Sequence, residues 1–227
     1  MKRKLPFFPL LLMVLLLPLQ SCALNYSAAP IEAWVVDAES GKPLEGVIVT
    51  ANWRLMGGLE GGNELGQMMV METITDKSGR FYFPAWGPKR NVSDGHIKSD
   101  GPQLLLFKSG YRYVVLSNKT SVTDRPGPSL KSDWNGKTIE MKLFKGPLIE
   151  YEKHLGSLRT NLGFAYYGES CEWRQAPRMI AAQHKENLRF KAAGIIDPAG
   201  DSVLTISAVR NQKQCGQAQE FFREYIK

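Results

Sequence analysis

The sequence is poor in the residues that build metal sites and nucleophile–base pairs, with three histidines and three cysteines in 227 residues. It has no C-x-x-C pair, so the usual spacing of zinc ligands is missing. It also has no G-x-S-x-G or H-E-x-x-H motif, no Walker A loop and no dinucleotide fingerprint. No catalytic residue, metal ligand or cofactor is therefore predicted, and the expected class is a non-enzyme.

One short segment brings carboxylates and an imidazole close together in the sequence, with Asp94, His96 and Asp100. Such a set can hold a divalent cation. Asp and Gly are also the usual residues of a solvated turn, and this second interpretation is the one we favour.

The chain has no apolar run of the length that spans a bilayer, which takes about 20 residues. The run Leu5–Leu19 is shorter, is interrupted by prolines and follows the basic residues Lys2, Arg3 and Lys4. A basic start, an apolar middle and a small-residue exit are typical of an export signal. Residues 1–21 are interpreted as this signal.

The next residues, Leu19-Gln20-Ser21-Cys22, resemble a bacterial lipobox. In lipoproteins the cysteine is acylated and begins the mature chain, and its two or more acyl chains give stable anchoring. The resemblance implies a cell-envelope protein tethered to a membrane through Cys22. Ala23 in place of Asp favours the outer membrane, facing the periplasm. The alternative is a plain cleaved signal with a chance cysteine.

Removing residues 1–21 lowers the formal charge from +7 to +4 and leaves 206 residues. An exported chain of this charge is not expected to bind nucleic acid. If Cys22 is acylated, Cys171 and Cys215 remain, and an even number of cysteines in an oxidising compartment predicts a disulfide. Two free thiols or half of a metal site are the alternatives.

The mature chain divides near Lys145. Residues 22–30 read as a tether, and residues 31–144 consist of strands and turns. Alternating apolar and polar residues predict seven short strands, which is typical of an antiparallel β-sandwich: Ile31–Asp37, Val47–Arg54, Met68–Thr75, Arg80–Pro84, Gln103–Lys108, Tyr111–Ser117 and Lys137–Leu143.

Three elements of this part resemble the carboxypeptidase regulatory-like domain, which has a transthyretin-like fold. Asp37–Val49 resembles its opening hairpin, Thr75–Phe83 its T-D-x-x-G-x-F-x-F hairpin, and Gly110-Tyr111 its late corner. In the second hairpin the aromatic residues have a physical role, since Phe81 and Phe83 can fill the space between two sheets. The family is mostly non-catalytic, so the resemblance implies a fold and an accessory, structural or carbohydrate-associated role.

Two segments exceed the family pattern, Met56–Gln67, which is rich in glycine, and Ala85–Gly101. Both are predicted to be loops, and loops carry binding residues. Trp86 and Trp134 fall in predicted loops and could stack on sugars. The expected function is a structural or protein-interaction module, docking another envelope protein or its own copies through an edge strand. A glycan-binding accessory module is the alternative.

Residues 145–227 have helical periodicity. Apolar residues step by three and four from Leu148 to Ala165, Pro177–Ala193 has a proline start and a glycine stop, and Gly216–Lys227 is amphipathic. A helical region closed by one disulfide and packed on the sandwich is therefore expected.

Overall fold

The computed structural model describes residues 25–57, 62–98, 101–119, 129–168, 170–195, 203–210 and 212–227. Residues 1–21 and Cys22, which carry the predicted export signal and lipidation site, lie outside the described residues. None of the helices in the described ranges has the length and apolar character that crossing a membrane requires.

The described part of the chain contains eleven strands, and each of the seven expected strands overlaps one of them. In order they are β1 (Asn25–Ala28), β2 (Ile31–Asp37), β3 (Ile48–Gly57), β4 (Asn63–Ile74), β5 (Arg80–Phe83), β6 (Trp86–Arg90), β7 (His96–Ile97), β8 (Gln103–Phe107), β9 (Val114–Leu116), β10 (Ser129–Leu130) and β11 (Thr138–Met141).

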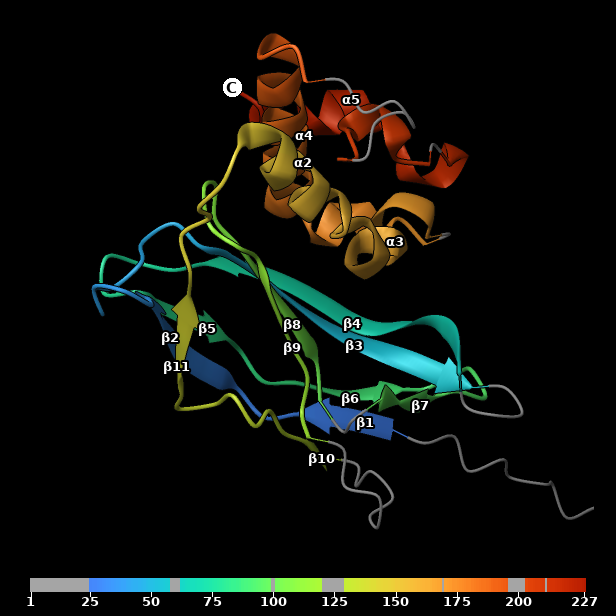
Figure 1. Ribbon diagram of the computed structural model, residues 1–227. Helices are drawn as coiled ribbons and strands as arrows, with labels where there is room; N and C mark the ends of the chain where they lie inside the picture. The colour runs from blue at the N-terminus through green and yellow to red at the C-terminus, as the bar shows by residue number, and fades with distance from the viewer. Residues whose placement is uncertain are drawn as a thin grey trace, which may run out of the picture.

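The strands form three small sheets arranged as two layers, and the helices cover one of these layers (Figure 1). The largest sheet has the order β4-β3-β8-β9, with β7 also paired to β3. The other two sheets, β11-β2-β5 and β10-β1-β6, lie on its far side from the helices. The expectation of a wholly antiparallel sandwich is wrong, because β11 pairs with β2, and β10 with β1, in parallel.

The two faces of the large sheet belong to two different hydrophobic cores. Along β3, Val49, Ala51 and Trp53 point into the core between the sheets. On neighbouring strands, Val70 and Leu105 point the other way and pack against the helices. The period-two alternation of a strand thus supplies apolar side chains to both sides of one sheet.

The predicted tether includes ordered structure. Residues Asn25–Ala28 form β1, which pairs with β6 on one side and β10 on the other, and Tyr26 is fully buried. The sequence did not predict this strand, because it is only four residues long and Ala28, Ala29 and Pro30 suggested little structure.

Both predicted loops contain strands. Within Met56–Gln67, β3 continues to Gly57 and β4 starts at Asn63, and the register shifts twice along this pair, as at β-bulges. Gly57 ends β3, and Gly66, with φ +130°, lies beside one of these shifts, so these two glycines belong to irregular strand rather than to a loop. Within Ala85–Gly101, β6 and β7 add strands to two different sheets.

The helical region begins at Leu148 and lies on the large sheet (Figure 1). It consists of α2 (Leu148–Gly156), α3 (Arg159–Tyr167), α4 (Pro177–Ala192) and α5 (Ala218–Phe221), with the 3₁₀ turns η2 (Glu172–Gln175), η3 (Ile206–Ala208), η4 (Lys213–Cys215) and η5 (Phe222–Glu224).

The apolar stripe from Leu148 to Ala165 is therefore two helices rather than one, because the chain leaves the α-helix at Ser157 and Leu158, directly after Gly156. The expected C-terminal helix is a single turn of α-helix followed by a 3₁₀ turn. The predicted disulfide is confirmed: Cys171 and Cys215 are joined, with their Cα atoms 5.4 Å apart.

Candidate functional site

A cleft of about 890 Å³ opens where the β3–β4 pair passes under the helical region, and we name it the sheet–helix cleft. It is bounded by the glycine-rich ends of β3 and β4, by β6 with the turn after it, and by α3 with η2. Its lining mixes polar and apolar side chains, and the uncharged polar ones are Asn52, Gln67, Asn91, Ser93, Thr160, Asn161, Ser170 and Gln175. Its charged side chains are Arg54, Glu64, Lys89, Arg90 and Glu172.

The polar floor of the cleft follows from the alternation of β3. Thr50, Asn52 and Arg54 occupy the face of the strand that a simple sandwich would expose to water, but here the helices cover that face. Asn52 is only 4% exposed. Neither its amide nitrogen nor its amide oxygen has a hydrogen-bond partner within the described part of the chain.

An unpaired buried amide is costly, at about 1–3 kcal/mol for each lost partner, and most buried polar groups in proteins are paired. Asn52 therefore requires an explanation beyond packing. A ligand in the cleft that both donates and accepts hydrogen bonds would supply the missing partners.

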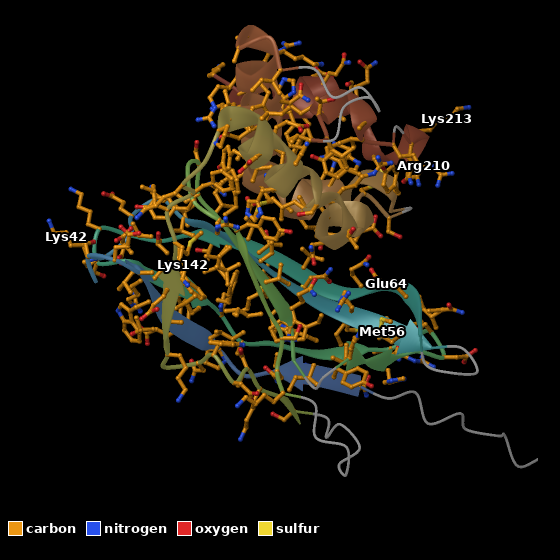
Figure 2. All side chains as sticks on the ribbon, in the orientation of Figure 1. Lys42, Met56, Glu64, Lys142, Arg210 and Lys213 are labelled. Atoms are coloured by element: carbon orange, nitrogen blue, oxygen red, sulfur yellow. A yellow bond between two sulfur atoms is a disulfide. The ribbon has the colours of Figure 1, made fainter. Side chains whose placement is uncertain are left out.

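The walls of the cleft are held by an ion pair and by local hydrogen bonds. Arg54 lies 3.7 Å from Glu64 across the β3–β4 pair, and Figure 2 labels Glu64 near the end of this pair, below α3. Lys89 donates from Nζ to the carbonyl of Met68 at 2.6 Å. On the helical side, Glu172 accepts from the backbone of Ser170 at 2.8 Å.

The rim of the cleft carries exposed apolar side chains. Leu65, Val92 and Tyr167 all line it and are among the most exposed large apolar residues of the described chain, Val92 being 90% exposed. Arg159 lies over the Tyr167 ring, with 5.7 Å from its guanidinium carbon to the ring centroid. The site therefore combines a floor in which the polar Asn52 lies beside the apolar Leu55 and Met68 with an apolar rim that includes one aromatic ring.

Next to the cleft, Glu72 on β4 fixes the start of α4. Its carboxylate accepts hydrogen bonds from the backbone N–H groups of Met179 and Arg178, both at 2.9 Å. These are N–H groups that a helix leaves unpaired at its first turn. Burial raises the pKa of Glu72 from 4.5 to about 7, although the two backbone hydrogen bonds oppose the rise.

This raised pKa predicts a loss of stability with rising pH. Because the pKa of Glu72 is higher in the folded state, its contribution is fully present below pH 4.5 and is lost as the pH rises through about 7. The shift corresponds to about 3 kcal/mol. The free energy of unfolding of the wild type, minus that of Glu72→Gln, should fall by this amount between pH 4.5 and pH 8 in urea titrations. A difference that stays constant over this range would contradict the assignment.

The two tryptophans proposed from the sequence do not belong to the cleft. Trp86 is buried in the sandwich core, where its ring packs edge-on against Trp53 at a centroid distance of 5.3 Å. The prediction that Trp86 lies in a loop is wrong, because Trp86 is the first residue of β6. Trp134 is half-buried against the sandwich core, and its Nε1 donates to the carbonyl of Ser117 at 3.3 Å.

The segment considered for a cation is described only in part. His96 lies in β7 opposite Met56 of β3, and Asp100 lies outside the described residues. In the described ranges, no three His, Cys, Asp or Glu side chains are placed to share a metal ion.

The sequence interpretation missed Asn52 and Tyr167. One signal for Asn52 was present, because Thr50, Asn52 and Arg54 form a polar face on a strand whose other face is apolar. That pattern is equally typical of a solvent-exposed strand, and only the helices that cover it make it a site. Tyr167 is the last residue of α3 and had no signal of its own.

No model of a known protein family matches the sequence, and a comparison with curated proteins finds no match. Among solved structures, 3-chlorocatechol 1,2-dioxygenase from Rhodococcus opacus 1CP is 16% identical with a TM-score of 0.30, over 57% of this chain and 64% of the enzyme. The group B streptococcus pilus 2b backbone protein is 14% identical with a TM-score of 0.25, over 51% and 41%.

The major pilin SpaD from Corynebacterium diphtheriae is 15% identical with a TM-score of 0.26, over 53% of this chain and 30% of the pilin. This chain covers less than two thirds of each of these proteins. All three TM-scores are below 0.5, so the similarities carry no argument about function.

Proposed function

We propose that this protein is a membrane-anchored lipoprotein of the bacterial cell envelope that acts as a non-catalytic binding module. In this proposal the strands form a transthyretin-like sandwich and the sheet–helix cleft is the binding site. The observation that carries it is the buried, unpaired amide of Asn52 at the floor of a cleft of about 890 Å³. Ligand sites of this kind are concave and of about 300–1,000 Å³, with a few polar groups that orient the ligand.

The anchor rests on the resemblance of Leu19–Cys22 to a lipobox. Only Ala23 and Leu24 separate Cys22 from β1. An extended residue spans at most about 3.6 Å, so a lipid on Cys22 would hold β1 within roughly 10 Å of the membrane surface. The partner should then be another molecule of the envelope.

The anchor is tested by replacing Cys22 with alanine and following processing in a bacterial host. We expect the wild-type protein in the membrane fraction, with a diacylated N-terminal cysteine in its mass spectrum. Cys22→Ala should accumulate as unprocessed precursor or as unlipidated protein. An unmodified wild-type N-terminus that begins elsewhere would refute the anchor.

The binding role is tested with the lipidated full-length protein, purified in detergent and immobilised, and exposed to envelope extract. Gly163 of α3 lines the cleft, and a Cβ built on it would meet no atom within 4 Å. Gly163→Trp should therefore fill the cleft without disturbing the core, while Gly163→Ala should leave it open. We expect wild type and Gly163→Ala to retain an envelope component that Gly163→Trp does not. Equal capture by all three would contradict a role for the cleft.

A further inference from the structure

We infer that the sheet–helix cleft binds a short, hydroxyl-rich oligosaccharide, which is held through Asn52 and covered by Tyr167. The inference rests on the proposed binding role of the cleft and names the ligand class. It differs from the sugar-binding surface expected from the sequence, because the tryptophans of that surface, Trp86 and Trp134, pack against the sandwich core.

The polar side chains that line the cleft match the chemistry of a polyol. An amide side chain offers two N–H donors and one carbonyl acceptor, and a sugar hydroxyl both donates and accepts. The cleft contains five amide side chains, Asn52, Gln67, Asn91, Asn161 and Gln175. The Asn91 amide is already paired at both ends, with the Gly95 carbonyl and with Ser93, and Gln67 donates to Glu64. A polyol can therefore pair with Asn161 and Gln175 and with both unpaired ends of the Asn52 amide.

The net charge of the cleft lining is small. The cleft lining contains three cations, Arg54, Lys89 and Arg90, and two anions, Glu64 and Glu172. Arg54 lies near Glu64, and the Lys89 ammonium is bonded to a backbone carbonyl. The net charge of about one does not suit a phosphate-rich ligand, which would need several free cations. It suits a neutral ligand, or one with a single acidic group that could pair with Arg90.

The rim of the cleft offers an aromatic surface to a sugar ring. Tyr167 is an exposed aromatic side chain at the edge of a polar cleft. An aromatic residue of this kind has an apolar body and a polar hydroxyl, which suits a surface that is partly wet. A sugar ring has an apolar face of C–H groups bordered by hydroxyls, so it can lie against Tyr167 while its hydroxyls reach the amides below.

The inference is tested by isothermal titration of the purified full-length protein with chitotriose, cellotriose and 3′-sialyllactose. The first probe is neutral and N-acetylated, the second is neutral without N-acetyl groups, and the third carries a single carboxylate. We expect the wild type to bind at least one of them. Asn52→Leu should weaken this binding by tenfold or more, Tyr167→Ala by fivefold or more, and Gly163→Trp should abolish it.

Thr50→Val is the matched control. Thr50 is on the same face of β3, is buried and has an unpaired hydroxyl in the described chain, but it does not line the cleft. The Kd of the Thr50→Val variant for the sugar should stay within twofold of the wild-type value. Because Asn52→Leu removes a buried group without partners, its melting temperature should equal or exceed that of the wild type, which separates lost binding from lost folding.

Binding of no probe at millimolar concentration would overturn the oligosaccharide assignment, as would binding that Gly163→Trp leaves unchanged. The proposed binding role has a separate test. It is refuted if capture from envelope extract is the same for the wild type, Gly163→Ala and Gly163→Trp. Capture of an envelope protein that depends on Gly163, without binding of any sugar, would therefore refute the ligand class and leave the role of the cleft in place.

Discussion

Replacing Phe81 with alanine is expected to lower the free energy of unfolding by about 3–5 kcal/mol, as for other large truncations in a core. Phe81 is 1% exposed, lies between the sheets and packs against the ring of Phe83 at a centroid distance of 5.8 Å. The truncation removes this ring and leaves a cavity that rigid strands cannot close. Urea unfolding of both proteins measures the difference.

The neighbouring residue on β5 provides the control. Tyr82 points to the opposite face of the strand and is 45% exposed. Tyr82→Ala should change the free energy of unfolding by less than about 1 kcal/mol, as is usual for surface positions. Equal losses of unfolding free energy for Phe81→Ala and Tyr82→Ala would contradict the placement of Phe81 between the two layers of strands.

Removal of the disulfide should have a similarly large effect. The bond between Cys171 and Cys215 closes a sequence separation of 44 residues, for which the chain-entropy model gives about 4 kcal/mol. The Cys171→Ala, Cys215→Ala double variant should lose this amount of stability against urea. Reducing agent should destabilise the wild type to the level of the double variant.

The same reagents supply the control for the disulfide. Reducing agent should not affect the double variant, which has no bond to break. Arg174 also donates from Nε and Nη2 to the carbonyl of Cys215, at 3.0 and 2.6 Å, so the two segments keep a contact without the disulfide. The double variant should therefore still fold at low urea. Alkylation of Cys171 and Cys215 in the native, unreduced protein would contradict the bond.

The strands were predictable where a strand has one apolar and one polar face. Ile31–Asp37 and Arg80–Phe83 show this alternation and form β2 and β5. The short strands β1, β7 and β10 were not predictable, because two to four residues carry too little periodicity. The sequence predicts a loop for the glycine-rich ends of β3 and β4, because glycine is rare in regular strands. These ends are strands because glycine is acceptable at bulges.

The candidate site could not be predicted, because it depends on packing between distant segments. Asn52 is on a strand face that looks solvent-exposed in the sequence, and α3 follows more than 100 residues later. Trp86 shows the converse error, in which an aromatic residue assigned to a loop starts a strand and fills the core. By contrast, the pairing of Cys171 with Cys215 was predicted from their even number and the expected oxidising compartment once Cys22 was set aside.

The side-chain amide of Asn52 tests the central claim most directly. In a heteronuclear NMR titration of ¹⁵N-labelled protein with the oligosaccharide that binds best, we expect the Asn52 NH₂ resonance to shift. Backbone amides of α3 and of β3 near the cleft should shift at the same ligand concentrations, and those of β2 and β5 should not. If the Asn52 resonance stays unchanged while amides elsewhere on the protein shift, the sheet–helix cleft is not the binding site.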